Sequence, residues 1–298
     1  MHAGLVSSPL REGHVSATRR VTGENREMKV GFIQYDVVHD REENFKIIEE
    51  ALAGLCCDIV VLPELCLSGY VYAGSKDLYR AAEYVPEGES TERMRKLSER
   101  YRCAVVFGLA EKTGRGICNT AVVVDHGRYV GKYQKMHLSD FEKRFFVRGE
   151  ENRVFSVCGI RIGVQICFDL WFPEMAREQV RLGADLLCVP ANFGGESTGK
   201  IAEIRALENL TPLVLCNRVG RETSVDMDAF FLGKSAVVAA TGEIICGGEA
   251  EKACSGRGEV TVPPCRANVI CGNFMAEMAL HDGGHAVLWK NGAPCTRL

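Results

Sequence analysis

The segment from Arg161 to Glu174 reads RIGVQICFDLWFPE, and it predicts a strand, a sharp turn and a helix in close succession. Arg161–Ile166 is an apolar run rich in β-branched residues, which is typical of a strand. Pro173 suits the first turn of a helix, because a proline there loses no helical hydrogen bond. Cys167 therefore stands at the tip of a strand, where an α/β fold can present a nucleophile.

The alternation of strand and helix extends on both sides of this segment, from Met28 to about Gly248. Short β-branched runs predict the strands, and amphipathic runs predict the helices. Besides Arg161–Ile166, the predicted strands are Met28–Tyr35, Asp58–Leu62, Cys103–Leu109, Cys118–Asp125, Arg128–Gln134, Val154–Val157, Asp185–Val189, Leu213–Asn217, Ser235–Ala239 and Glu243–Cys246. The predicted helices are Arg41–Ala53, Ser90–Tyr101, Pro173–Leu182 and Lys200–Asn209. This mixture predicts an α/β protein whose sheets carry helices on their outer faces.

The composition is that of an ordinary globular protein. The 298 residues are 46% hydrophobic and 25% charged, and the net charge of −3 gives no reason to expect a nucleic acid or an anionic membrane as partner. No apolar run approaches the ~20 residues that a membrane span needs. The 14 cysteines form no Cys-x-x-Cys pair, and most lie in apolar runs, where a reduced thiol packs as a small hydrophobe. We therefore expect a reducing, cytoplasmic setting, with no metal site and no cofactor.

Two further charged side chains stand at the ends of predicted strands. Glu64 follows the strand at 58–62, and Lys135 follows the strand at 128–134. A thiolate attacks a carbonyl only if one neighbour takes its proton and others stabilise the oxyanion. We expect Cys167 to supply the sulfur and Glu64, with a pKa raised by burial, to take and return the proton. Lys135 and the backbone N–H of Phe168 would hold the oxyanion.

Glu142 lies within reach of this group. Its position allows it to orient Lys135 or the substrate. The basic residues around it also allow a surface salt bridge, so both interpretations stay open at this point.

Three motifs resemble those of the nitrilase-like carbon–nitrogen hydrolase superfamily. They are LPELCLSGY at 62–70, GKYQKMHL at 131–138, and GVQICFD at 163–169 followed by FPE at 172–174, in the family's order and spacing. Further matches lie at 205–209, 217–220, 231–235 and 241–243. The resemblance implies a four-layer αββα sandwich of two mixed sheets with helices on the outer faces. It also implies a Glu–Lys–Cys triad at Glu64, Lys135 and Cys167, the family's second glutamate at Glu142, and assembly into homodimers or larger homo-oligomers.

The two ends of the chain depart from this pattern. Residues 1–27 are polar and aperiodic, which predicts a disordered leader or an extension added for expression. The carbon–nitrogen hydrolase domain is then expected at 28–250. Residues 251–298 are expected to form a divergent C-terminal segment, because they do not align with the Arg- and Tyr-containing tail that packs across a subunit interface in the family.

A serine hydrolase is one rival interpretation. The sequence GESTG at 195–199 matches a nucleophile elbow around Ser197, with Asp226 or Asp228 and then His281 or His285 downstream. An elbow directly follows a strand, however, and residues 190–194 intervene here. A loop near the pocket is the expected alternative.

Other histidine-based sites are also weaker than the triad. A pair of Cys167 and His137 would resemble a thiol protease, but it leaves the glutamate and the lysine without roles. His281 and His285 have the i, i+4 spacing of metal ligands, yet two glycines between them argue against a helix. A binding protein that has lost catalysis should have a substituted triad member, and no triad member is substituted.

The residues after Cys167 bear on the substrate. In the family, nitrilases tend to carry Trp-Glu there, whereas amidases and carbamoylases carry an aromatic residue followed by Asp, which Phe168-Asp169 resembles. Branches that bind anionic substrates often place an arginine two or three residues further on, where this chain has Leu170 and Trp171. The segment WFPE at 171–174 is similar to carbamoylases that act on amine-bearing substrates.

We therefore expect a pocket suited to a neutral or amine-bearing substrate. Trp171, Phe193 and Tyr70 are expected to line it, and Glu196 either meets a cationic end or is an exposed loop carboxylate. The expected reaction is hydrolysis of a non-peptide carbon–nitrogen bond in a small amide through a cysteine thioester, releasing ammonia or an amine and a carboxylic acid. The alternatives are an N-carbamoyl amine amidohydrolase that releases CO2 and ammonia, then a nitrilase, and, outside enzymes, a catalytically silent binding homologue.

Overall fold

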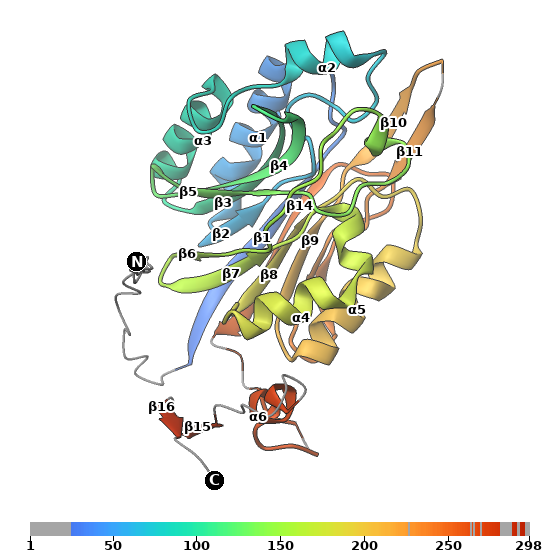
Figure 1. Ribbon diagram of the computed structural model, residues 1–298. Coiled ribbons are helices and arrows are strands. Elements are labelled where there is room, and N and C mark those ends of the chain that lie inside the picture. The colour runs from blue at the N-terminus through green and yellow to red at the C-terminus, as the bar shows by residue number, and fades with distance from the viewer. Residues whose placement is uncertain are drawn as a thin grey trace, which may run out of the picture. The chain divides into compact units, whose positions relative to one another are not determined.

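Two six-stranded mixed sheets lie face to face in the computed structural model (Figure 1). The structure describes residues 25–225, 227–262, 264, 266–268, 270–280, 288–290 and 293–295. The first sheet has the order β14 (Cys254–Val262), β1 (Arg26–Gln34), β2 (Ile59–Val61), β3 (Ala104–Thr113), β4 (Gly116–Asp125), β5 (Arg128–Gln134). The second has the order β13 (Ile244–Gly247), β12 (Ala236–Val238), β9 (Leu213–Cys216), β8 (Leu186–Pro190), β7 (Ile160–Val164), β6 (Val154–Val157).

In each sheet, three central parallel strands are flanked by antiparallel ones. β1, β2 and β3 run parallel, as do β7, β8 and β9. The carboxyl ends of β2 and β7 lead directly into Glu64 and Cys167. Open α/β sheets bind their ligands beyond the carboxyl ends of their strands, so this topology favours a site at that edge.

Alternating side chains of the first sheet build two separate cores. On β3, Ala104 and Val106 point into the core between the sheets, whereas Val105 and Phe107 point into the core beneath the helices. This period of two is what a strand buried on both faces requires. The outer core is closed by α1 (Arg41–Leu55) and α3 (Glu89–Arg100), as Figure 1 shows.

The sequence explains where these helices begin. The Asp40 side chain accepts hydrogen bonds from the backbone N–H groups of Glu42 and Glu43, which caps α1. Pro173 is the first residue of α4 (Pro173–Arg181). α4 and α5 (Ser197–Asn209) cover the outer face of the second sheet (Figure 1). The predicted four-layer αββα sandwich is therefore confirmed.

Four elements of the sandwich were missing from the sequence prediction. They are α2 (Ser75–Ala81), the hairpin of β10 (Val219–Thr223) and β11 (Asp228–Leu232), and β14. β14 pairs with β1 over its whole length, so the first sheet extends past residue 250 to Val262. The sequence of β14 does not predict a strand, because this edge strand has few apolar residues. Gly256 is required there, since a Cβ would lie 2.5 Å from the Phe32 ring.

The two ends of the chain belong to a second unit. Residues 25–275 form one compact unit, and residues 1–24 and 276–298 are assigned to the other, with α6 (Phe274–Ala279) spanning the junction. In the second unit, β15 (Leu288–Lys290) pairs with β16 (Ala293–Cys295). Most of the predicted leader, together with Asp226, His281 and His285, lies outside the described residues, and the predicted domain boundaries stay predictions. Among the described helices, none combines the length and apolarity that a membrane crossing requires.

Candidate active site

Glu64 and Lys135 meet Glu142 in a fully buried cluster. The Lys135 Nζ lies 2.7 Å from Glu64 Oε1 and 2.6 Å from Glu142 Oε1. Glu142 precedes the two basic residues of a 3-10 turn, η1 (Glu142–Arg144), and its Oε2 accepts the backbone N–H of Ser139. Because the Glu142 side chain is 0% exposed, the alternative of a surface salt bridge is wrong. The Lys135 ammonium therefore lies between the two carboxylates.

Close backbone packing holds Glu64 in this cluster. Glu64 lies just beyond β2, and the backbone of Gly108 on β3 passes directly beside it. A Cβ at Gly108 would lie 2.4 Å from the Leu65 nitrogen, so only glycine fits.

Asn119 is a member of this cluster that the sequence motifs did not single out. It is fully buried on β4, and its Nδ2 donates to Glu64 Oε1 at 2.6 Å and to Glu142 Oε1 at 3.1 Å. Its backbone carbonyl also accepts the Lys135 N–H. The available signal was a polar Asn119-Thr120 pair interrupting an otherwise apolar strand, since buried polar groups need partners.

Cys167 opens a short 3-10 turn, η2 (Cys167–Trp171), that links β7 to α4. Its φ of +51° lies in the left-handed region, which is strained for a residue with a Cβ. The Sγ lies 3.8 Å from the Asn192 carbonyl oxygen. The turn therefore displays the sulfur at the end of β7, as predicted, although the strand ends two residues earlier than expected.

Asp169 fixes this turn against the neighbouring sheet. Its carboxylate is fully buried and accepts four hydrogen bonds: from the Tyr133 hydroxyl, the Ile166 N–H, the His137 N–H and His137 Nδ1, at 2.8 to 3.0 Å. The His137 ring also stacks on Phe172, with centroids 3.7 Å apart. The described partners of His137 are thus Asp169 and Phe172, which leaves it no thiol-protease role beside Cys167.

Burial and charge set unequal proton affinities in the cluster. Burial raises the pKa of Glu64 to about 7, even though Lys135 opposes the rise. Burial also acts to raise the pKa of Glu142, but Lys135 and Ser139 outweigh it and hold that pKa below its usual value. Burial and the nearby Glu64 charge keep the pKa of Cys167 well above its usual value. One carboxyl is thereby adjusted to exchange protons near neutral pH while the other stays ionised.

The reactive sulfur opens on a cavity of about 380 Å³. The three predicted pocket residues, Tyr70, Trp171 and Phe193, line it, as does Phe168, which was predicted as an oxyanion donor; the other lining residues are Ser139, Glu142, Cys167, Asn192, Gly195, Ser197 and Thr198. Four of these residues are aromatic, and Trp171, 45% exposed, is the most exposed of the four rings. Small-molecule sites have this combination of apolar walls and few polar groups.

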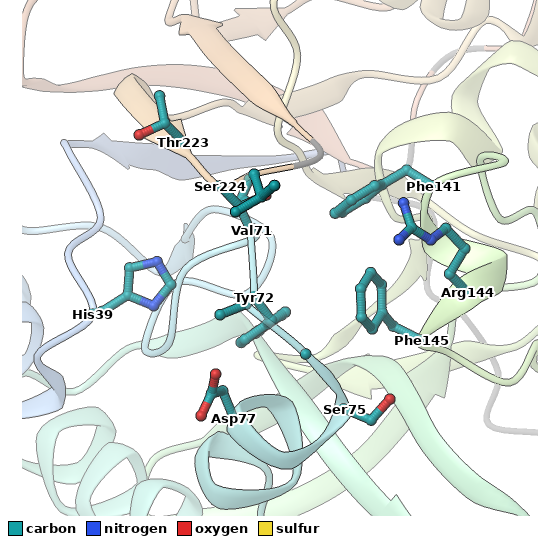
Figure 2. A pocket seen from close by; sticks show the side chains of 13 residues that line it. His39, Val71, Tyr72, Ser75, Asp77, Phe141, Arg144, Phe145, Thr223 and Ser224 are labelled. Carbon is teal, nitrogen blue, oxygen red and sulfur yellow. The ribbon is translucent and has the colours of Figure 1, made fainter.

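A larger cavity, of about 600 Å³, is lined by Val71 and Tyr72, whereas the preceding Tyr70 lines the cavity of Cys167 (Figure 2). His39, Tyr72, Phe141 and Arg144 are among its lining residues, whereas Glu64, Lys135 and Cys167 are not. It is therefore not the cavity that contains the reactive sulfur. Glu222 holds the intervening loop by accepting the N–H groups of Tyr70 and Val71.

The serine hydrolase interpretation receives no support from the described residues. Ser197 is the exposed first residue of α5, and Asp228 pairs instead with Arg221 at 3.0 Å. Asp226 and both candidate histidines lie outside the described residues. Glu196 is an exposed loop carboxylate that pairs with Lys234 at 2.8 Å.

Comparisons with known proteins agree with this geometry. The model of the carbon–nitrogen hydrolase family matches residues 29–254. A nitrilase of Pyrococcus abyssi is 36% identical over 224 residues, which cover 73% of this chain and 84% of that protein. An N-carbamoylputrescine amidase of Arabidopsis thaliana is 29% identical over 249 residues, which cover 75% and 83%.

The chain also resembles solved amidases. An amidase from Nesterenkonia sp. matches with a TM-score of 0.69 and 26% identity, covering 83% of this chain and 91% of that one. A variant of the amidase from Nesterenkonia sp. AN1 matches with a TM-score of 0.69 and 26% identity, covering 78% of this chain and 89% of that one. That structure shows covalent addition of the acetamide moiety of fluoroacetamide at the active-site cysteine. This chain therefore belongs to the carbon–nitrogen hydrolase family and is a cysteine-dependent hydrolase.

Proposed function

We propose that this enzyme hydrolyses small neutral amides through a thioester on Cys167. The observation that carries the proposal is the buried Glu64–Lys135–Glu142 cluster beside a cavity that Cys167 lines. A buried charge cluster of this kind is expensive to maintain, so it is expected where chemistry uses it.

The proton inventory supports Glu64 as the general base. Oε1 of Glu64 is engaged by Lys135 and Asn119, whereas Oε2 is buried and has no hydrogen-bond partner among the described residues. Oε2 is therefore available to take the thiol proton. A pKa of about 7 allows the same carboxyl to return that proton to a leaving nitrogen.

Lys135 is suited to bind the oxyanion. Two of the three N–H bonds of its ammonium point to Glu64 and Glu142, which leaves one for the substrate. The N–H of Phe168, the residue after the nucleophile, is the second proposed donor.

The steps then balance as an acyl transfer. Glu64 takes the Cys167 proton, and the sulfur attacks the amide carbon to form a tetrahedral oxyanion. Glu64 gives the proton to the nitrogen, the carbon–nitrogen bond breaks, and ammonia leaves a thioester behind. Glu64 then takes a proton from water, which attacks the thioester. The carboxylic acid is released, and Glu64 returns the proton to the sulfur, which regenerates the free thiol.

The charges around the cavity favour a neutral substrate. Among the described residues that line it, none is lysine or arginine. Arg205 lies nearby, but it donates to the carbonyls of Leu170 and Trp171 and pairs with Glu208. A carboxylate on the substrate would lose its hydration without gaining a charged partner from the cavity wall. Burying an unpaired charge in this way costs on the order of several kcal/mol.

An N-carbamoyl amine is the second candidate. Trp171 at the cavity mouth gives an amine-bearing tail a ring for a cation–π contact. The plant relatives named N-carbamoylputrescine amidase also favour it. Glu196 does not, because its carboxylate is already paired with Lys234.

Two measurements test the proposal. Fluoroacetamide should alkylate Cys167, which peptide mass mapping would detect. The same peptide should stay unmodified in the Cys167→Ala variant. Ammonia release is then compared across aliphatic amides, N-carbamoyl amines, carboxylate-bearing amides and nitriles. Neutral amides should give the highest kcat/KM. If carboxylate-bearing amides were fastest, the charge argument would be wrong, and CO2 release with ammonia would identify a carbamoyl substrate.

A further inference from the structure

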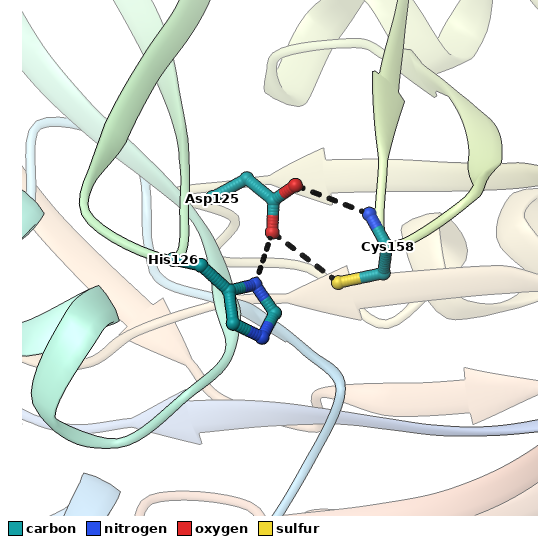
Figure 3. A group of neighbouring side chains, drawn as sticks. All are labelled: Asp125, His126 and Cys158. Carbon is teal, nitrogen blue, oxygen red and sulfur yellow. Dashed lines mark hydrogen bonds and ion pairs between the residues drawn. The ribbon is translucent and has the colours of Figure 1, made fainter.

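Asp125, His126 and Cys158 form a compact cluster of three different metal-binding side chains (Figure 3). Their ligand atoms all lie within 4.8 Å of one another. Asp125 is the last residue of β4, His126 begins the turn between β4 and β5, and Cys158 comes from the turn between β6 and β7. The cluster thus joins the first sheet to the second.

The two carboxylate oxygens of Asp125 have different hydrogen-bond partners. Oδ1 faces the two other ligand atoms, at 2.6 Å from His126 Nδ1 and 3.4 Å from Cys158 Sγ. Oδ2 is held by the Cys158 backbone N–H at 3.2 Å and by Arg128 at 3.3 Å. Figure 3 shows the contacts among the three clustered residues. Metal-binding carboxylates are commonly arranged this way, with one oxygen on the ion and the other fixed by outer hydrogen bonds.

Backbone geometry holds the ligands before any ion binds. His126 and Cys158 both have left-handed φ values, of +47° and +48°, and each precedes a glycine with a φ near +80°. These are the dihedral angles of tight hairpin turns, so each ligand sits on a short and well-defined loop. The His126 side chain is 46% exposed and gives an ion a route from solvent, whereas the Asp125 side chain is 5% exposed.

We propose that Asp125, His126 and Cys158 bind a zinc ion that ties the two sheets together. Thiolate, imidazole and carboxylate are the ligands that Zn²⁺ takes in proteins, and a water completes a tetrahedral set. A thiolate and a carboxylate together neutralise the charge of the ion. The Cys158 thiol now lies between two acceptors, the Asp58 carbonyl oxygen at 3.3 Å and Asp125 Oδ1 at 3.4 Å, and binding the ion would replace its S–H hydrogen.

The proton balance follows from this replacement. Cys158 releases its thiol proton to solvent when sulfur binds the ion. His126 would bind the ion through Nδ1 and carry its ring N–H on Nε2. One proton is therefore released for each zinc bound by these ligands.

The site is independent of the reaction proposed above. Asn119 and Asp125 are six residues apart on β4, which separates the cluster from the catalytic carboxylates by about 20 Å at ~3.4 Å per residue. The sequence pattern gave no sign of a metal site here, because the proposed ligands share no short motif. Asp125 and Cys158 lie 33 residues apart in the chain and meet only in the fold.

The experiment titrates the full chain with Zn²⁺ by calorimetry in two buffers of different ionisation enthalpy. We expect one zinc per chain and one proton released per zinc. Co²⁺ should give a near-ultraviolet thiolate charge-transfer band. Saturating zinc should raise Tm by roughly 5 °C, because an ion that joins the sheets stabilises only the folded chain.

Variants locate the ion. Cys158→Ser and His126→Ala should each weaken binding by more than about 100-fold, since loss of an outer partner alone costs 10- to 100-fold. Cys56→Ser removes an exposed thiol elsewhere and should bind normally. Cys167→Ala should also keep the cobalt band. Ammonia release by Cys158→Ser should match the parent enzyme, which separates this proposal from the proposed function.

Three results would overturn the zinc site. They are the absence of stoichiometric binding, a cobalt band that persists in Cys158→Ser, and loss of binding in Cys167→Ala, which would place the ion at the reactive cysteine. Circular dichroism of each variant distinguishes a lost ligand from a lost fold.

Discussion

Replacing Asn119 by leucine should move the pH dependence of the reaction without removing any group that touches the substrate. Asn119 donates one amide group to both Glu64 and Glu142, at 2.6 and 3.1 Å. These bonds favour the ionised carboxylates and therefore hold the pKa of Glu64 down. Leucine has nearly the same shape and donates nothing. The pKa of Glu64 should consequently rise above its value of about 7.

The size of the change follows from the energy of the bonds. A hydrogen bond to a charged group contributes about 1.5–3 kcal/mol, and one pKa unit corresponds to ~1.36 kcal/mol. The acidic limb of kcat/KM should therefore move up by about 1 to 2 pH units. Measured well above the new limb, kcat should approach that of the parent enzyme, because the base is again ionised there.

The assay is ammonia release from the best neutral amide, measured as kcat/KM from acid to alkaline pH. Asn44→Leu is the matched control, because Asn44 is equally buried and, among the described residues, its side chain bonds to the backbone of Val38 and to no carboxylate. It should lower stability and leave the limb in place. A limb that stayed in place in Asn119→Leu, or moved to lower pH, would refute the assignment of Glu64 as the titrating base.

Three other substitutions test separate parts of the structure. Lys135→Ala should lower kcat at least roughly 100-fold, because it removes an oxyanion donor and leaves two buried carboxylates facing each other. Asp169→Asn should lower both kcat and Tm, since an amide cannot accept all four donors and the loss per charged bond is about 1.5–3 kcal/mol; full activity would contradict its positioning role. Burial acts to raise the pKa of Glu222, but His39 and Arg218 lower it to about 2. Glu222 should therefore add up to roughly 3 kcal/mol to the free energy of unfolding above pH 4.5, and this contribution should be lost as the pH falls toward 2. In urea titrations, Glu222→Gln should be less stable than the parent at neutral pH, and its stability should depend less on pH in the acid range.

The sequence was informative where each residue's role depends on its own segment. Strand tips, a proline at a helix start and the motifs around Glu64, Lys135 and Cys167 are local features, and the structure brings Glu64 and Lys135 together and has Cys167 line the neighbouring cavity. Pocket aromatics such as Trp171 follow from the same motifs. The sandwich itself was predictable because β-branched runs buried on both faces demand helices outside them.

Elements and residues defined by distant partners escaped prediction. β14 has an edge strand's mixed composition, and only its pairing with β1 identifies it. Asn119 acquires its role from two glutamates that lie far from it in the chain. Asp169 was noted only as part of a motif, since three of its four donors belong to Tyr133 and His137, more than 30 residues away in the chain.

The contacts of Asp169 also explain how a triad divided between two sheets keeps its geometry. Glu64 and Lys135 follow strands of the first sheet, and Cys167 follows a strand of the second. The apolar core between the sheets holds them together, but apolar contacts are non-directional and do not fix a sulfur to a fraction of an ångström. Asp169 supplies directional bonds across that boundary, from the turn of Cys167 to Tyr133 and to the backbone of His137, two residues beyond Lys135. A substitution that repacks the core should therefore reduce stability more than turnover, whereas one that breaks these bonds should reduce turnover more than stability.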